Sequence, residues 1–150
     1  MDDLVRELYQ EVILDHYRHP RNYGRVENDV RSVLGDNPLC GDRIEVFAKV
    51  EDGRLAEIRF EGSGCAISTA SASLMTEHLK GKSVEEALAM IQAFHDMVTE
   101  GVKSERLGPL QVFEGVRDYP SRIKCAVLAW HALKAAILEQ SETVTTEADE

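Results

Sequence analysis

The feature of this sequence that most constrains its fold is a pair of alternating segments joined by Asp52 and Gly53. The first segment begins at Arg43 and places apolar side chains on one side: Ile44, Val46, Ala48 and Val50. The returning segment, residues 55 to 61, places three on one side: Ala56, Ile58 and Phe60. A period of two is typical of a half-buried strand, and an Asp-Gly pair accepts the positive φ angles of a tight turn. The pattern therefore predicts an antiparallel hairpin with one buried face.

Helical periodicity lies on both sides of this hairpin. Residues 3 to about 18 carry apolar side chains at helical spacing, which indicates an amphipathic opening helix. After the hairpin, a glycine turn leads into a run of small residues that predicts a helix closed by Gly81. Ser83 and Glu86 match a capping box, so we expect a further helix from there to about residue 100. A final helix is expected to start at Pro120.

The order of these elements predicts the fold class. Strands come first and helices follow, which favours an α+β domain with helices packed on one face of a small antiparallel sheet. Residues 30–34 are expected to add a short strand, and residues 107–116 to form a loop with a short helical turn. We expect residues 1–140 to form a single domain. Residues 141–150 are acidic and almost without large apolar side chains, so we expect a disordered tail.

Composition and charge exclude several classes of function. The chain has 150 residues, a net charge of −10 and three cysteines. The negative charge argues against binding nucleic acid, and no run of about 18 apolar residues predicts a membrane span. The N-terminal residues lack the layout of a signal peptide, so we expect a cytoplasmic protein. An odd number of cysteines in a reducing compartment argues against a disulfide framework.

Each of the three cysteines lies at a boundary between predicted elements. Cys40 precedes the first strong strand, Cys65 follows the glycine turn before a helix, and Cys125 lies near the start of the last helix. A helix N-terminus favours the thiolate, which is the form that binds metal and attacks sulfur. Since strand and helix ends often gather at one edge of such a domain, we expect the three thiols to converge.

Asp42 adds a carboxylate beside the first thiol, with only Gly41 between them. Three thiolates and one carboxylate would form a tetrahedral set that suits zinc. Spacing alone leaves a second interpretation open, in which the cysteines are small buried core residues. Asp42 could likewise be a turn residue that binds local backbone.

Four segments in the same order resemble the U-type iron–sulfur cluster assembly proteins. They are LYQEVILDHYRHPRNYG, NPLCGDRIEV, FEGSGCAISTASASLM and YPSRIKCAVLAWHAL, within residues 4 to about 138. Lys124 stands where the IscU branch has a histidine before its third cysteine, and YPSRIK replaces the LPPVK motif. The gap between the second and third cysteines is also longer. The chain therefore resembles the SufU branch of the IscU/NifU N-terminal family.

The resemblance implies a fold and a metal site. The implied fold is α+β with a three-stranded antiparallel sheet. The implied Zn²⁺ ligands are Cys40, Asp42, Cys65 and Cys125. Cys40 precedes a turn, so we hypothesise that it is the ligand that leaves and accepts sulfur.

The implied function is that of a sulfur carrier rather than a conventional small-molecule enzyme. It would take persulfide sulfur from a SufS-like cysteine desulfurase and pass it to the assembly scaffold. Lys124 and Arg122 could stabilise a thiolate or persulfide, or meet an acidic partner. Two alternatives stay open. The chain could be a scaffold that builds a transient [2Fe–2S] cluster for apo-proteins, or a structural zinc domain without turnover.

Overall fold

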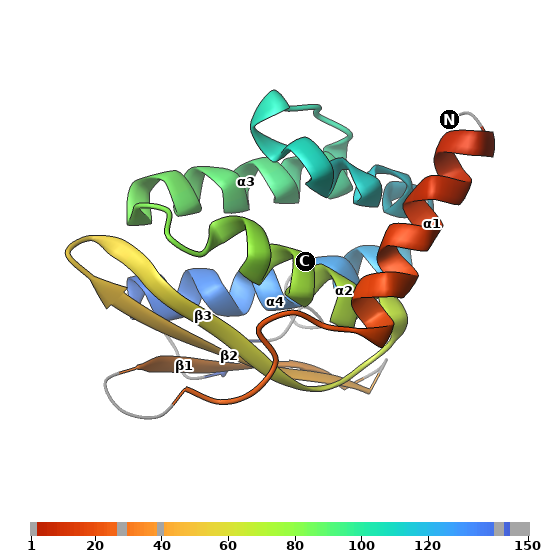
Figure 1. Ribbon diagram of the computed structural model, residues 1–150. Helices are drawn as coiled ribbons and strands as arrows, with labels where there is room; N and C mark the ends of the chain where they lie inside the picture. Colours follow the sequence, from red (N-terminus) through yellow and green to blue (C-terminus); the bar gives the residue numbers. More distant parts are fainter. Residues whose placement is uncertain (1–2, 27–29, 39–40, 140–142, 145–150) are drawn as a thin grey trace.

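The computed structural model of this chain describes residues 3–26, 30–38, 41–139 and 143–144 (Figure 1). Its elements follow in this order: α1 Asp3–Arg18, β1 Arg31–Asn37, β2 Asp42–Glu51, β3 Arg54–Ser63, α2 Ala66–Leu79, α3 Val84–Glu100, the 3₁₀ helix η1 Glu105–Asp118, α4 Pro120–Leu138 and β4 Thr143–Val144. The predicted opening helix, capped helix and final helix all lie where the sequence pattern placed them. No helix among the described residues is long and apolar enough to cross a membrane.

The sheet has the order β3-β2-β1-β4. Its first three strands pair antiparallel, so the predicted α+β class and the three-stranded antiparallel sheet are confirmed. β1 is longer than the predicted residues 30–34 because pairing with β2 extends it to Asn37, opposite Asp42. The expected disordered tail lies largely outside the described residues. Within it, Thr143 and Val144 pair parallel with β1, and the disorder of the tail stays a prediction.

The hairpin turns at Asp52 and Gly53, whose φ angles of 51° and 74° are both positive as predicted. Beside the turn, Lys49 pairs with Glu57 and the next residue of β2 pairs with Leu55, which leaves Ala56 as an extra residue on β3. This bulge corrects the predicted inward set. Leu55 is fully buried instead of Ala56, because an extra residue reverses the side to which the strand's end points.

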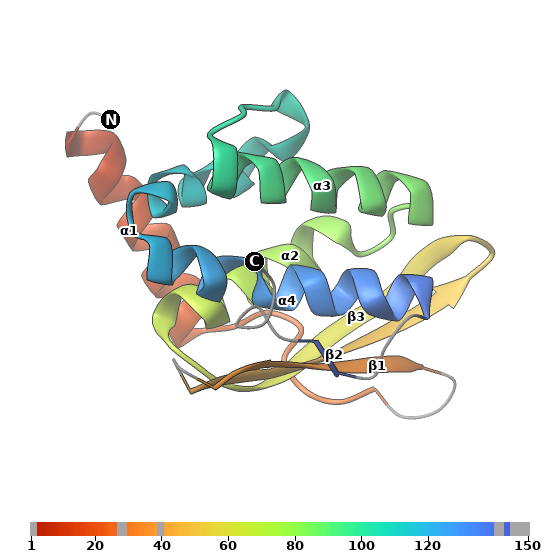
Figure 2. The ribbon, with the colours of Figure 1, turned by 180° about the vertical axis from the view of Figure 1, so that it is seen from behind.

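The helices cover one face of the sheet (Figures 1 and 2). α4 lies against β1, and a Cβ at Gly35 would come within 3.0 Å of the Leu128 side chain. Farther from the sheet, α3 packs on α4 through Phe94, whose ring stacks on Trp130 with 4.1 Å between the centroids. Phe113 of η1 meets the same phenylalanine edge-on. The core thus lies between the sheet and two layers of helix.

η1 replaces the loop that we expected at residues 107–116. It is a 3₁₀ helix with a kink at Gly108, where φ is 48°. Four of its five buried apolar residues recur at every third position, Leu107, Leu110, Phe113 and Val116, and the fifth is Val112. A 3₁₀ helix has three residues per turn, so these side chains form one face toward α3. The prediction was wrong because a period of three matches neither the α-helical nor the strand pattern.

Candidate metal centre

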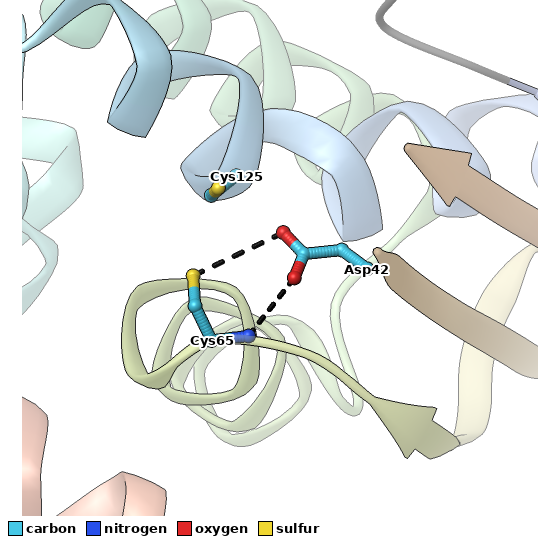
Figure 3. Close-up of side chains that lie close together, drawn as sticks. All are labelled: Asp42, Cys65 and Cys125. Carbon is cyan, nitrogen blue, oxygen red and sulfur yellow. Dashed lines mark hydrogen bonds between the residues drawn. The ribbon is translucent and has the colours of Figure 1, made fainter. Parts of the chain in front are cut away.

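Three of the four predicted ligands come together at one end of the sheet (Figure 3). Asp42 is the first residue of β2, Cys65 immediately precedes α2, and Cys125 lies in the second turn of α4. One oxygen of Asp42 and the sulfur atoms of both cysteines all lie within 4.8 Å of one another. The predicted convergence is confirmed for these three residues. Cys40 lies outside the described residues, so its position as the fourth ligand stays a prediction.

Asp42 is a carboxylate with no exposed surface. Its Oδ1 accepts a hydrogen bond from the backbone N–H of Cys65 at 2.9 Å. Its Oδ2 lies 3.9 Å from the sulfur of Cys65 (Figure 3). Burying a carboxylate is costly unless a cation or several donors stabilise it. Here Oδ1 of Asp42 accepts a backbone hydrogen bond, and Oδ2 faces the sulfur atoms.

Cys65 is the N-cap residue of α2, as the glycine turn before it predicted. Its sulfur accepts the backbone N–H of Ser68 at 3.4 Å. Hydrogen bonding from Cys125 lowers the pKa of the Cys65 thiol to about 6, helped by the Ser68 N–H and opposed by burial and by the charge of Asp42. Near neutral pH Cys65 is thus the thiolate of the pair.

Cys125 lies near the start of α4, as predicted. It belongs to the second turn and is buried, with its thiol 3.5 Å from the backbone carbonyl oxygen of Ser121. Its hydrogen bond to Cys65 raises the pKa of Cys125 above the usual range, and burial and Asp42 raise that pKa further. Between the two thiols the proton therefore stays on Cys125.

The donor set fits zinc. Tetrahedral coordination with Zn–S bonds of about 2.3 Å separates two sulfur ligands by about 3.8 Å. The described ligand atoms lie within 4.8 Å of one another, and Oδ2 of Asp42 already stands 3.9 Å from one sulfur. Two sulfur atoms and one carboxylate oxygen suit zinc better than magnesium or calcium, which prefer oxygen alone.

Residues on either side of Cys40 in the sequence lie close to each other at this site. Asn37 and Asp42 pair as the last and first residues of β1 and β2. The N–H of Gly41 donates to the carbonyl of Asn37 at 2.8 Å, and the φ of Gly41 is 76°. Gly41 thus lies against the end of β1 directly before Asp42, as expected from a glycine beside the ligands.

The two predicted basic neighbours both lie on α4. Arg122 is exposed in the first turn, and Lys124 is half-buried directly before Cys125. On a helix, positions three apart share a face whereas adjacent positions do not. Arg122 thus lies on the same side as the thiol, and Lys124 is turned away by about 100°. Their predicted effects on thiolate or partner stay predictions.

The sequence analysis missed two contributors. Gly64 borders Asp42, because a Cβ there would lie 2.9 Å from Oδ1. Ser68 supplies an N–H to the Cys65 sulfur and is itself buried. Both could have been found from the position of Cys65 as an N-cap, because the residue before an N-cap and the residue three after it flank the capping group.

Residues 8–146 match the protein family described as the NifU-like N terminal domain. A zinc-dependent sulfurtransferase, SufU of Bacillus subtilis, is 46% identical over 135 residues, covering 89% of this chain and 91% of the relative. An iron–sulfur cluster assembly scaffold protein, IscU of Streptococcus pyogenes, is 43% identical, with 89% and 84% covered. The crystal structure of a nitrogen-fixing NifU-like protein (N-terminal) from Brucella abortus superposes with a TM-score of 0.77 at 27% identity, covering 93% of this chain and all of that one.

Proposed function

This chain belongs to the NifU-like N-terminal domain family, and from that premise we propose that it is a zinc-bound sulfur acceptor in iron–sulfur cluster assembly. The observation that carries the proposal is the buried group of Asp42, Cys65 and Cys125, whose ligand atoms lie within 4.8 Å. The name of the Bacillus subtilis relative, a zinc-dependent sulfurtransferase, supports the same activity. We place this work in the cytoplasm, where thiols stay reduced.

Zinc would be held by these three residues and Cys40, and when bound it keeps sulfur ligands deprotonated at neutral pH. The surroundings of each cysteine indicate which one leaves the metal to accept sulfur. Cys125 is buried, and the sulfur of Cys65 is held by the Ser68 N–H and lies near Asp42. Cys125 is therefore not accessible to a persulfide on another protein, and we assign the acceptor role to Cys40, which precedes a turn in the sequence.

The proposed transfer is an exchange between two sulfur atoms. The Cys40 thiolate attacks the outer sulfur of a persulfide on the catalytic cysteine of a SufS-like desulfurase. A new S–S bond forms on Cys40 while the bond on the desulfurase breaks, and the desulfurase cysteine leaves as a thiolate. No oxidant or reductant is consumed. The carried sulfur then passes to the assembly scaffold by attack of a further thiolate.

The experiment that tests this proposal combines a rate and a mass. Purified zinc-loaded protein should increase the rate at which a SufS-like desulfurase turns over cysteine. Intact-mass spectrometry without reductant should show one added sulfur atom, which peptide mapping places on Cys40. Cys40→Ala should abolish both effects, whereas Thr69→Ala, which alters a half-buried side chain of α2, should keep them. If Cys40→Ala transfers sulfur unchanged, the assignment of the acceptor is wrong.

A scaffold role is the second candidate, and the name of the Streptococcus pyogenes relative favours it. In that role the same ligands would hold a transient [2Fe–2S] cluster as cargo for apo-proteins. Incubation with iron, cysteine and desulfurase without oxygen would then yield a cluster that moves to an apo-ferredoxin. Such transfer without desulfurase stimulation would replace our proposal. Tight zinc with neither activity would leave a structural zinc domain.

A further inference from the structure

Ser68 carries a hydroxyl whose proton is not used. Its side chain is 1% exposed, and among the described residues it is the one buried hydroxyl without a hydrogen-bond partner. Leaving a buried polar group unpaired destabilises the folded state, so such groups are rare and call for a reason.

Other helical hydroxyls in this chain do use their protons. Ser71 donates to the carbonyl of Ala126 at 2.6 Å, and Thr99 donates to the carbonyl four residues earlier at 2.6 Å. Thr76 donates to the carbonyl three residues earlier at 2.7 Å. The bonds of Thr76 and Thr99 to a carbonyl of the preceding turn are the usual way in which a helical hydroxyl uses its proton. Ser68 lies in the first turn of α2 and does not adopt it.

The Ser68 hydroxyl and the carboxylate of Asp42 both lie next to Gly64. A Cβ at Gly64 would lie 3.2 Å from Ser68 Oγ and 2.9 Å from Asp42 Oδ1. The two oxygens therefore flank the same point, and glycine leaves the space between them open. The backbone N–H of Ser68 meanwhile donates to the sulfur of Cys65. Ser68 thus contacts one ligand through its backbone N–H, and its hydroxyl lies beside the glycine that the other ligand also approaches.

We propose that Ser68 is a positioning residue of the metal centre, whose hydroxyl donates to Asp42 Oδ1 when Oδ2 binds the metal. Oδ1 accepts one backbone hydrogen bond, from Cys65, and a carboxylate oxygen can accept a second. Two donors on Oδ1 hold the carboxylate so that Oδ2 alone faces the sulfur atoms. Donors to a ligating carboxylate orient it and strengthen metal binding. This inference rests on the zinc site of the proposed function.

Metal binding would give the Ser68 hydroxyl an acceptor. Drawing Oδ2 toward the ion would turn the carboxylate and bring Oδ1 to the hydroxyl. A residue retained for one state of a site destabilises the other state, which is the common trade between stability and function.

Ser68→Ala tests this proposal with two measurements, the zinc affinity and the melting temperature of the metal-free protein. Zinc affinity, measured by competition with a chromogenic chelator, should fall about tenfold, the usual effect of losing a partner of a ligand. The melting temperature of the metal-free protein should rise or stay unchanged, because alanine removes the unpaired hydroxyl and favours helix. Ser68→Thr retains the hydroxyl and should restore most of the affinity. Thr69→Ala on the same helix should alter the affinity by less than about twofold.

A double-mutant cycle shows whether Ser68 acts through Asp42. In an Asp42→Ala background, Ser68→Ala should cause no further loss of zinc affinity. An equal loss in both backgrounds would overturn the proposal, and so would an unchanged affinity in the single variant. A lower melting temperature of the metal-free variant, with affinity lost in proportion, would assign Ser68 a merely structural role. If the parent protein binds no zinc, the proposed function fails as well, so the two failures are distinguishable.

Discussion

The carboxylate of Asp42 accepts the backbone N–H of Cys65 and lies next to Gly64, which has no side chain. Gly64 has an ordinary φ, so another residue there would not strain the backbone. A Cβ would, however, lie 2.9 Å from Asp42 Oδ1 and 3.3 Å from its carboxyl carbon. Contacts under 3.0 Å force something to shift, and here the neighbour is a buried ligand. At the scale of single residues, Gly64 makes room for the carboxylate.

Gly64→Ala should therefore weaken zinc binding by at least about tenfold, because the added methyl group displaces the carboxylate from the sulfur atoms. Chelator competition measures this. Ser63→Ala changes an exposed neighbour and should leave the affinity unchanged. A Gly64→Ala protein that folds and binds zinc as tightly as the parent would show that Asp42 does not need its present position.

At the scale of elements, a small polar network joins α1 to α2. Ser73 Oγ accepts the backbone N–H of Arg21 at 2.9 Å and lies 2.7 Å from Nδ1 of His16. Since this hydroxyl already accepts one bond, its own proton is available to His16, whose neutral ring then keeps its proton on Nε2. His16 is 5% exposed, and Nε2 lies 3.8 Å from a carboxylate oxygen of Glu77. The contact between the two helices thus depends on a neutral histidine.

Burial lowers the pKa of His16 below its ordinary 6.5, and the charges of Arg21 and His78 lower it further, while Glu77 and Asp15 oppose this. The unfolded chain therefore binds the proton more readily. The contribution of His16 to stability is complete above about pH 6.5 and is lost as the pH falls below that value toward the lowered folded-state pKa.

Urea unfolding of the metal-free protein at about pH 7.5 and about pH 5.5 measures this loss. His16→Gln does not titrate and should lose less stability between the two pH values than the parent. His19→Gln, which alters a side chain that is 76% exposed, should behave like the parent. Equal losses in parent and His16→Gln would exclude this residue as the source.

At the scale of the whole molecule, the metal centre joins the sheet to both helices that lie next to it. Asp42 begins β2, Cys65 caps α2, and Cys125 belongs to α4. These residues lie far apart in the sequence, so they are brought together only in the folded chain. A metal that needs all of them binds the folded state and stabilises it by mass action.

Removing zinc should therefore lower the melting temperature. Free zinc at 100 times its dissociation constant would stabilise the fold by about 2.7 kcal/mol, and a strong chelator should remove that amount. Scanning calorimetry with zinc and with chelator measures the difference. Asp42→Ala should shrink it. An equal melting temperature with zinc and with chelator would show that zinc does not bridge these elements.

Much of the fold could be predicted from the sequence because its signals are local. The Asp52-Gly53 turn and the Ser83 cap depend on near neighbours, and both are confirmed. The alternation is confirmed at Ile44, Val46 and Ala48, whereas Val50 is half-buried and Phe47 on the other face is also buried. Where long-range packing decides, the predictions were wrong. The extra residue at Ala56 follows from the register of two strands, and η1 follows from packing on α3.

The sequence by itself determined which groups could bind a metal, since thiols at element boundaries and a carboxylate beside one of them are visible in the order of residues. Only the tertiary structure decided that Asp42, Cys65 and Cys125 share one point, that Cys125 is buried in a second turn, and that Ser68 and the carboxylate both lie beside Gly64. The physical reason is that the ability of a side chain to ligate is a property of one residue. Distance, burial and proton sharing are properties of residues that become neighbours only when the sheet and helices pack.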